Sequence, residues 1–177
     1  GLTYKRLNVL KAIQLAKASV SGTPQPPSTN ASSNAIAYDA NGVLHLAYYD
    51  EGSKNLKYAS RSEGGVWSSA TTVDSGVMAG QFVSIAVDSD NHPGIAYYDA
   101  NNGDLKYAHF NGSSWNVMTA DSKFTTSYYP SLQFDAIDQP NITYYYKTGA
   151  DLKMAILTGG AWVLSTIDSA DDVGRYS

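Results

Sequence analysis

Cysteine is absent from this chain of 177 residues, so neither disulfide bonds nor thiolate metal sites are available to it. Glutamate and arginine are scarce, with only Glu51 and Glu63 of the first kind and Arg6, Arg61 and Arg175 of the second. No apolar run approaches the roughly 18 to 20 residues that a transmembrane helix needs. With 43% hydrophobic residues and a mean hydropathy of -0.28, the composition indicates a globular chain instead.

Acidic residues are missing from the first 38 positions, which hold four basic ones. Residues 39 to 177 therefore contain all 16 acids and the other 8 bases, a balance of -8. An acidic body disfavours nucleic-acid binding, which needs clustered lysine and arginine. We expect no nucleic-acid partner.

An internal repeat of about 47 residues dominates the rest of the chain. Five landmarks keep the same order in three copies, so chance does not explain them. These landmarks are AYYD, AYYD and TYYY at 47–50, 96–99 and 143–146; LKYA, LKYA and LKMA at 56–59, 105–108 and 152–155; Trp67, Trp115 and Trp162; Asp74, Asp121 and Asp168; and Asp39, Asp88 and Asp135.

Each repeat reads as four short strands, which in the middle copy cover 84–88, 95–99, 105–110 and 115–120. The turns between them are too short for a parallel crossover, so each repeat is predicted to be an antiparallel four-stranded meander. The first two strands are apolar on both faces, which indicates sheets covered on both sides. We therefore predict an all-β fold of three β-propeller blades; a β-sandwich or an open stack of meanders is the alternative.

The predicted organisation has three parts. Residues 1–20 form a basic amphipathic helix or arm, and residues 21–34 form a linker rich in serine and proline. The blades cover about 35–76, 77–123 and 124–169, and the start of a linker to a fourth blade follows. The simpler interpretation is that the arm packs on the sheets. The alternative is that residues 2–20 contact an anionic membrane.

Three blades fall short of the 4 to 8 that close a propeller. Either the chain is part of a longer array, or it is a protomer that completes a ring by self-association. Head-to-tail contacts between copies close into rings, and we favour a homo-oligomer formed by blade-to-blade contact.

The turn before each tryptophan resembles the Asp-box, S-x-D-x-G-x-T-W, of sialidase-like repeat propellers. The three copies read SRSEGGVW at 60–67, AHFNGSSW at 108–115 and AILTGGAW at 155–162. Glycine and tryptophan persist, but the aspartate is missing from all three and the threonine is replaced, so these boxes are degenerate. Enzymes of that family use three arginines, a tyrosine–glutamate pair and an aspartate, which the scarce arginines and glutamates here do not match. We expect no catalysis and keep a glycoside hydrolase as the weakest hypothesis.

The resemblance also implies that ligands bind on the face that carries the loops after each second strand and the linkers between blades. An aromatic residue recurs at one linker register, where it either stacks on a sugar or plugs the seam between blades. The tyrosine pairs of the second strands are instead predicted to be core, one ring toward each neighbouring blade. The predicted ligand-binding residues are Phe82, Tyr129, Tyr176, Arg175, Asp50, Asp99 and Asn101.

Segments that begin at Asp39, Asp88 and Asp135 resemble the start of calcium loops but have no downstream glutamate. Asx turns are the simpler interpretation, and we predict no cofactor, with calcium as the minor alternative.

Three N-x-[ST] sequons, at Asn30, Asn111 and Asn141, favour secretion. The sequence thus predicts a secreted, non-catalytic module that recognises a glycan or another cell-surface ligand. A structural protein of an extracellular fibre or surface layer is the alternative.

Overall fold

The computed structural model describes residues 31–122 and 127–174. The predicted N-terminal helix lies outside these residues, and so do Arg175 and Tyr176. The first sheet contains β1 (Ala31–Tyr38), β2 (Leu44–Asp50), β3 (Asn55–Arg61) and β4 (Thr71–Asp74). The second contains β5 (Ala79–Val87), β6 (Pro93–Asp99), β7 (Asp104–Phe110) and β8 (Trp115–Asp121). The third contains β9 (Ser127–Phe134), β10 (Pro140–Tyr146), β11 (Asp151–Thr158) and β12 (Ala161–Asp168).

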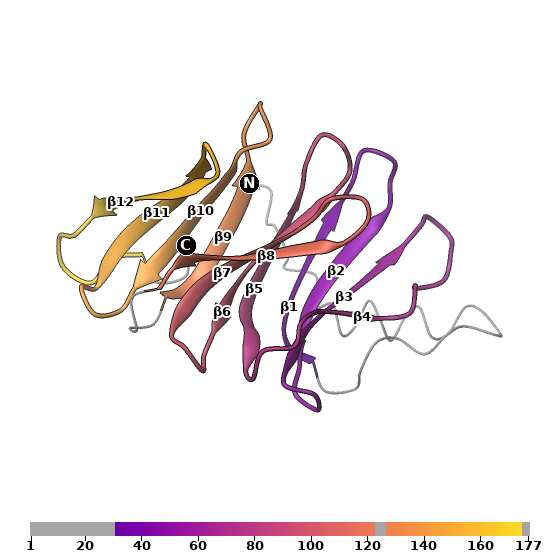
Figure 1. The fold of residues 1–177 in the computed structure, drawn as a ribbon, viewed down its shortest axis with the longest axis horizontal. Coiled ribbons are helices and arrows are strands. Elements are labelled where there is room, and N and C mark those ends of the chain that lie inside the picture. Colours follow the sequence, from indigo (N-terminus) through magenta and orange to yellow (C-terminus); the bar gives the residue numbers. More distant parts are fainter. Residues whose placement is uncertain (1–30, 123–126, 175–177) are drawn as a thin grey trace, which may run out of the picture.

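Within each sheet the four strands follow sequence order and every pair is antiparallel. The three sheets lie side by side, face against face (Figure 1). The prediction of an all-β chain whose repeats form four-stranded meanders that resemble propeller blades is therefore confirmed. No helix that could cross a membrane occurs in the part of the chain that the structure describes.

The first strand of each sheet begins earlier than predicted. It starts at Ala31, Ala79 and Ser127, whereas the apolar segments that end at Asp39, Asp88 and Asp135 in the repeat indicated starts at 35, 84 and 131. The predicted linker 21–34 was therefore wrong at its end, because β1 already occupies its last four residues. Bulges explain the error, since the pairing of β5 with β6 shifts register twice before Ser84. A shifted register breaks the alternation from which a strand is recognised.

The second strand of each sheet lies in the core. Every residue of β6 is buried, which fits a sheet that is covered on both faces. One apolar cluster joins the first sheet to the second and another joins the second to the third. The tyrosine pair of β6 divides between them as predicted: Tyr97 packs toward the first sheet, and Tyr98 contacts Tyr128 of the third at a ring distance of 5.3 Å.

In the second and third sheets, a tyrosine hydroxyl joins the sheet to the last strand of the sheet before it. Tyr97 donates to Asp74 Oδ2 at 2.6 Å, and Tyr144 donates to Asp121 Oδ2 at 2.7 Å. Both aspartates end the fourth strand of their sheet, so the same bond recurs at both seams. Because burying an unpaired hydroxyl costs free energy, the bond fixes how each sheet sits on its neighbour. We call this bond the tyrosine latch.

Two of the three tryptophans that recur in the repeat also lie at the seams. Trp115 of β8 meets the edge of Tyr58 in the first sheet at a ring distance of 5.1 Å. Trp162 of β12 meets Tyr107 in the second sheet at 5.4 Å in the same T-shaped manner. Edge-to-face pairs of this kind add about 0.5–1.5 kcal/mol beyond the area they bury. The tryptophans after the second and third degenerate boxes therefore pack against the preceding sheet, whereas Trp67, after the first box, packs in the apolar cluster of its own sheet.

Asp74 also binds Lys106, whose Nζ donates to Oδ2 at 2.6 Å. Burial by itself would raise the pKa of Asp74, but the hydrogen bonds from Lys106, Tyr97 and the Gly76 N–H outweigh it and hold the pKa below its usual value. A lowered pKa means that the folded state favours the ionised carboxylate, so this stabilisation is present above pH 3.8, the ordinary value, and fades as the pH falls through the folded-state pKa.

We therefore expect the free energy of unfolding to fall as the pH drops below about 4, and to fall less steeply in Asp74→Asn. Urea unfolding between pH 2.5 and 7 measures both slopes. Asp168→Asn is the matched control, because Asp168 holds the same repeat position and accepts the Ala170 N–H, while the described residues offer it no tyrosine. Equal slopes for Asp74→Asn and the parent protein would contradict the expectation.

Candidate functional site

The predicted site residues that the structure describes lie along one edge of the three sheets. Ala79, which begins β5, pairs with Asp99, which ends β6. The starts of the first strands and the turns after the second strands therefore share an edge, as the predicted binding face requires. Phe82 and Tyr129 lie inside β5 and β9 and not in linkers, which corrects their predicted setting.

Phe82 and Tyr129 meet across the seam between the second and third sheets, with ring centres 4.9 Å apart. Tyr128 lies 5.0 Å from Phe82, and Tyr98 completes the group at 6.2 Å from Phe82. We call these four residues the seam cluster. Tyr98 is buried, and burial raises the pKa of its hydroxyl, whereas the other three rings are half-buried. The cluster thus fills the seam and still presents ring surface to solvent.

A cation borders the seam cluster. Lys147, an exposed residue just after β10, places its Nζ 5.4 Å from the centre of the Tyr128 ring. Cation–π attraction at an exposed position is worth about 0.5–1 kcal/mol, enough to keep the ammonium near the ring. The edge of the cluster therefore offers a hydrogen-bond donor beside its aromatic surface.

The backbone is strained at both recurring aromatics. Phe82 has φ of 50° and Tyr129 has φ of 55°, in the left-handed region that residues other than glycine seldom adopt. Such a conformation costs about 1–2 kcal/mol per residue. Pairing of the first and second strands is also irregular beside each of them. The two bulges turn these rings out of the regular alternation and toward one another across the seam.

The acidic residues predicted for this edge organise their own turns. Asp50 accepts hydrogen bonds from the Gly52 N–H and from Ser53 Oγ. Asp99 is 2% exposed and accepts bonds from Asn102 Nδ2 and from the N–H of Asn101. The side chain of Asn101 itself remains exposed. Of these three predicted residues, Asn101 is the one whose side chain faces solvent.

A carboxylate pair does occur here, at the two ends of the turn after β6. Asp99 pairs with Asp104 across this turn. Burial raises the pKa of Asp104, and the nearby charge of Asp99 adds to the rise. Glycoside hydrolysis needs two carboxyl groups on opposite sides of an open cleft. The Asp99 carboxylate instead accepts hydrogen bonds inside its turn, so the two carboxyl groups do not face each other across a cleft.

The opposite edge of the sheets carries the loops that resemble calcium sites. Asp39, Asp88 and Asp135 each accept two backbone N–H groups through Oδ1, at 2.7 to 3.0 Å. These are the Asx turns of the simpler interpretation. In the described ranges, no three His, Asp or Glu side chains gather into a metal site.

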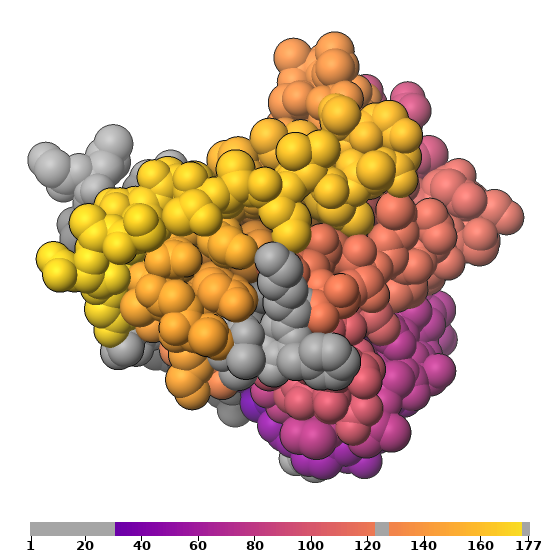
Figure 2. All heavy atoms as spheres, turned by 60° about the vertical axis from the view of Figure 1, so that its left-hand side comes forward, coloured from indigo at the N-terminus to yellow at the C-terminus, as the bar shows by residue number. Residues whose placement is uncertain are grey.

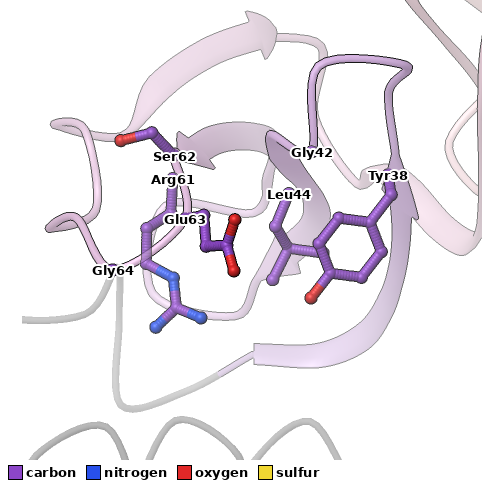
Figure 3. Close-up of a pocket in the computed structure, with 7 residues that line it drawn as sticks. All are labelled: Tyr38, Gly42, Leu44, Arg61, Ser62, Glu63 and Gly64. Atoms are coloured by element: carbon purple, nitrogen blue, oxygen red, sulfur yellow. The ribbon is translucent and has the colours of Figure 1, made fainter.

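A pocket that the sequence analysis did not predict opens at this opposite edge in the first sheet (Figure 3). It has a volume of about 340 Å³ and lies between the end of β1, the start of β2 and the loop after β3. Figure 3 shows Tyr38, Arg61 and Glu63 directed toward its interior, with Leu44 behind them. The sequence does contain one sign of this pocket, because Arg61 stands where the other repeats have the apolar residues Phe110 and Leu157.

Comparison with known proteins finds the fold but no family: no family model matches the chain, and no curated protein matches it either. A fucose lectin from Kordia zhangzhouensis, solved with methyl-fucoside, is 16% identical with a TM-score of 0.52, and the match covers 78% of this chain and 100% of the lectin. The exo-β-1,3-galactanase of Phanerochaete chrysosporium, solved with β-1,3-galactotriose, is 14% identical with a TM-score of 0.52.

The match to the galactanase covers 84% of this chain but 38% of the enzyme. An intramolecular trans-sialidase from Ruminococcus gnavus gives a TM-score of 0.47 at 18% identity, over 70% of this chain and 30% of that enzyme. At these identities the similarity establishes the fold alone. The chain is thus structurally similar to a lectin over that protein's whole length and to part of a larger glycosidase.

Because the backbone is strained at Phe82, we expect glycine at this position to be more stable than alanine, the reverse of the usual order in a strand. Phe82→Ala loses the ring contacts and keeps the strain, so we expect the free energy of unfolding to fall by about 1–3 kcal/mol, less than for a fully buried phenylalanine. Phe82→Gly loses the same contacts but relieves the strain, so it should be more stable than Phe82→Ala. Urea denaturation ranks the variants. An alanine variant more stable than the glycine variant, the usual order in a strand, would show that φ is not positive.

Proposed function

We propose that this chain is a secreted, non-catalytic module that recognises carbohydrates through the seam cluster. The observation that carries the proposal is the half-buried group of aromatic rings that two strained bulges hold at the edge of a seam. Aromatic rings stack on the apolar face of a sugar, while neighbouring amides and ammonium groups bond to its hydroxyls. Lys147 and Asn101 lie on the two sheets that form this seam and supply such groups.

The comparison with solved structures supports the ligand class. The fucose lectin shares the fold and was solved with methyl-fucoside. The scarcity of glutamate supports the absence of catalysis: Glu51 is held by Lys54 at 2.6 Å, and Glu63 lines the pocket at the opposite edge. We propose that the ligand is a glycan on a cell surface.

A glycan array followed by calorimetric titration tests this proposal. Each stacked ring contributes about 1 kcal/mol, so the double variant Phe82→Ala, Tyr129→Ala should weaken the Kd about tenfold to a hundredfold. Ile137→Ala is the control, because it removes an exposed apolar side chain at the opposite edge. Circular dichroism confirms that each variant is folded.

Two results would overturn it. One is equal affinity of the double variant and the parent protein. The other is the absence of any glycan ligand together with filaments or sheets under the electron microscope, which would favour the structural alternative.

We also propose that further blades cover the outer face of the third sheet, and that a second copy of the chain supplies them. Ile167 is 50% exposed, whereas Val73 and Ala120 at the same repeat position are 8% and 5% exposed. These two residues pack in the seams toward the next sheet. Figure 2 shows β12, in yellow, lying across the surface of the molecule. An apolar position that is buried at both seams and open here indicates an uncovered seam face.

Mass measurement by light scattering tests self-association. We expect a multiple of 19.0 kDa for the parent chain and a shift toward the monomer for Ile167→Asp, because a charge would be buried unpaired. Thr166→Asp is the matched control and should keep the larger mass, because Thr166 is exposed and holds the repeat position of Thr72 and Thr119, which stay exposed although their sheets are covered. A parent chain that is monomeric throughout the concentration range contradicts the proposal.

A further inference from the structure

We propose that the pocket beside Arg61 is a second glycan site, that it takes a neutral sugar, and that it binds independently of the seam cluster. The ligand class rests on the proposed function, but the site does not. The pocket lies at the edge of the first sheet that carries the Asx turns, opposite to the edge of the seam cluster. The two sites therefore share no residue.

Arg61 is the residue that points to a ligand. Its guanidinium carbon lies 5.3 Å from the centre of the Trp67 ring, which is 9% exposed, so the planar group is held in place by cation–π attraction. Its Nε is buried and has no hydrogen-bond partner in the described part of the chain. A buried donor without a partner is unfavourable, and it belongs to a guanidinium that lines the pocket, where a ligand oxygen would bind beside it.

Glu63 defines the charge of that ligand. Its carboxylate enters the same pocket (Figure 3), and no ion pair within the described residues neutralises it or Arg61. An anionic ligand would be attracted by Arg61 but repelled by Glu63, and a cationic ligand would be attracted by Glu63 but repelled by Arg61. Hydroxyl groups both donate and accept, so a polyol can bond to the guanidinium and the carboxylate together.

Tyr38 and Leu44 provide the apolar part of the pocket. The Tyr38 side chain is 66% exposed, and its ring stands beside Leu44 at the pocket wall in Figure 3. A sugar presents an apolar face of C–H groups as well as hydroxyls, which distinguishes it from a purely polar solute. The volume of about 340 Å³ is at the small end of the range for ligand pockets, which fits one or two sugar rings.

Titration followed by NMR tests the inference on the full chain. The Nε–H resonance of Arg61, assigned by its loss in Arg61→Lys, is recorded while methyl glycosides of fucose, galactose and glucose are added. We expect at least one neutral glycoside to shift this resonance and methyl glucuronide to bind at least tenfold more weakly. Tyr38→Ala and Glu63→Gln should each weaken binding about tenfold, and thermal unfolding shows whether each variant is folded.

The design separates this inference from the proposed function. Phe82→Ala, Tyr129→Ala should leave the Arg61 shift unchanged, and Tyr38→Ala should leave binding at the seam cluster unchanged. The inference is overturned if no neutral glycoside shifts the Arg61 resonance, if methyl glucuronide binds more tightly than the neutral sugars, or if the seam-cluster variant abolishes the shift. None of these results depends on whether the seam cluster binds a glycan.

Discussion

The tyrosine latch is the contact on which the rest of the structure depends. A strand such as β6 is apolar on both faces, so its sheet is stable only between two others. Apolar packing is not directional and would allow sheets to slide over one another. The hydroxyl of Tyr97 donates to Asp74. The tyrosine latch therefore fixes the position of the second sheet relative to the first, which apolar packing alone would leave variable. Its recurrence at Tyr144 and Asp121 gives both seams the same geometry.

That geometry brings the starts of the first strands into contact across each seam. The seam between the second and third sheets uses this contact for aromatic rings on strained backbone, whereas the seam between the first and second uses Ser33, whose Oγ accepts the Val83 N–H. The same architecture therefore offers different surfaces at successive seams. A repeat that is uniform in its buried strands is free to vary at its edges, which is where the two candidate sites lie.

Much of the fold could be predicted from the sequence because it follows from periodicity. The repeated AYYD and LKYA segments indicated meanders, and the division of Tyr97 and Tyr98 between two seams follows from the alternation of side chains along a strand. The predicted start of β5 was wrong because two bulges interrupt its pairing, one at Gly80 and one at Phe82, and the second has positive φ at a residue that is not glycine. That conformation is imposed by packing across the seam and not by local preference.

The pocket beside Arg61 was not predicted, because it does not follow from the periodicity of the sequence. Most of the predicted site residues recur in the repeat, whereas Arg61 departs from it. The acids of the recurrent loops were attractive candidates on chemistry alone, yet Asp50 and Asp99 accept hydrogen bonds from groups of their own turns. Short polar turns need such acceptors to satisfy their backbone, so an aspartate there says more about the turn than about a ligand.

The turns between first and second strands are also joined from sheet to sheet: the Ala40 N–H donates to Asn91 Oδ1 at 3.0 Å, and the Ser89 N–H donates to Asp138 Oδ1 at 2.9 Å. Every contact of this kind links nearest neighbours that are about one repeat apart in sequence. Folding of such an array is expected to spread from one sheet to the next, as in a one-dimensional chain of coupled units. The middle sheet, which has a neighbour on both sides, is then the natural place for folding to begin and the last to come apart.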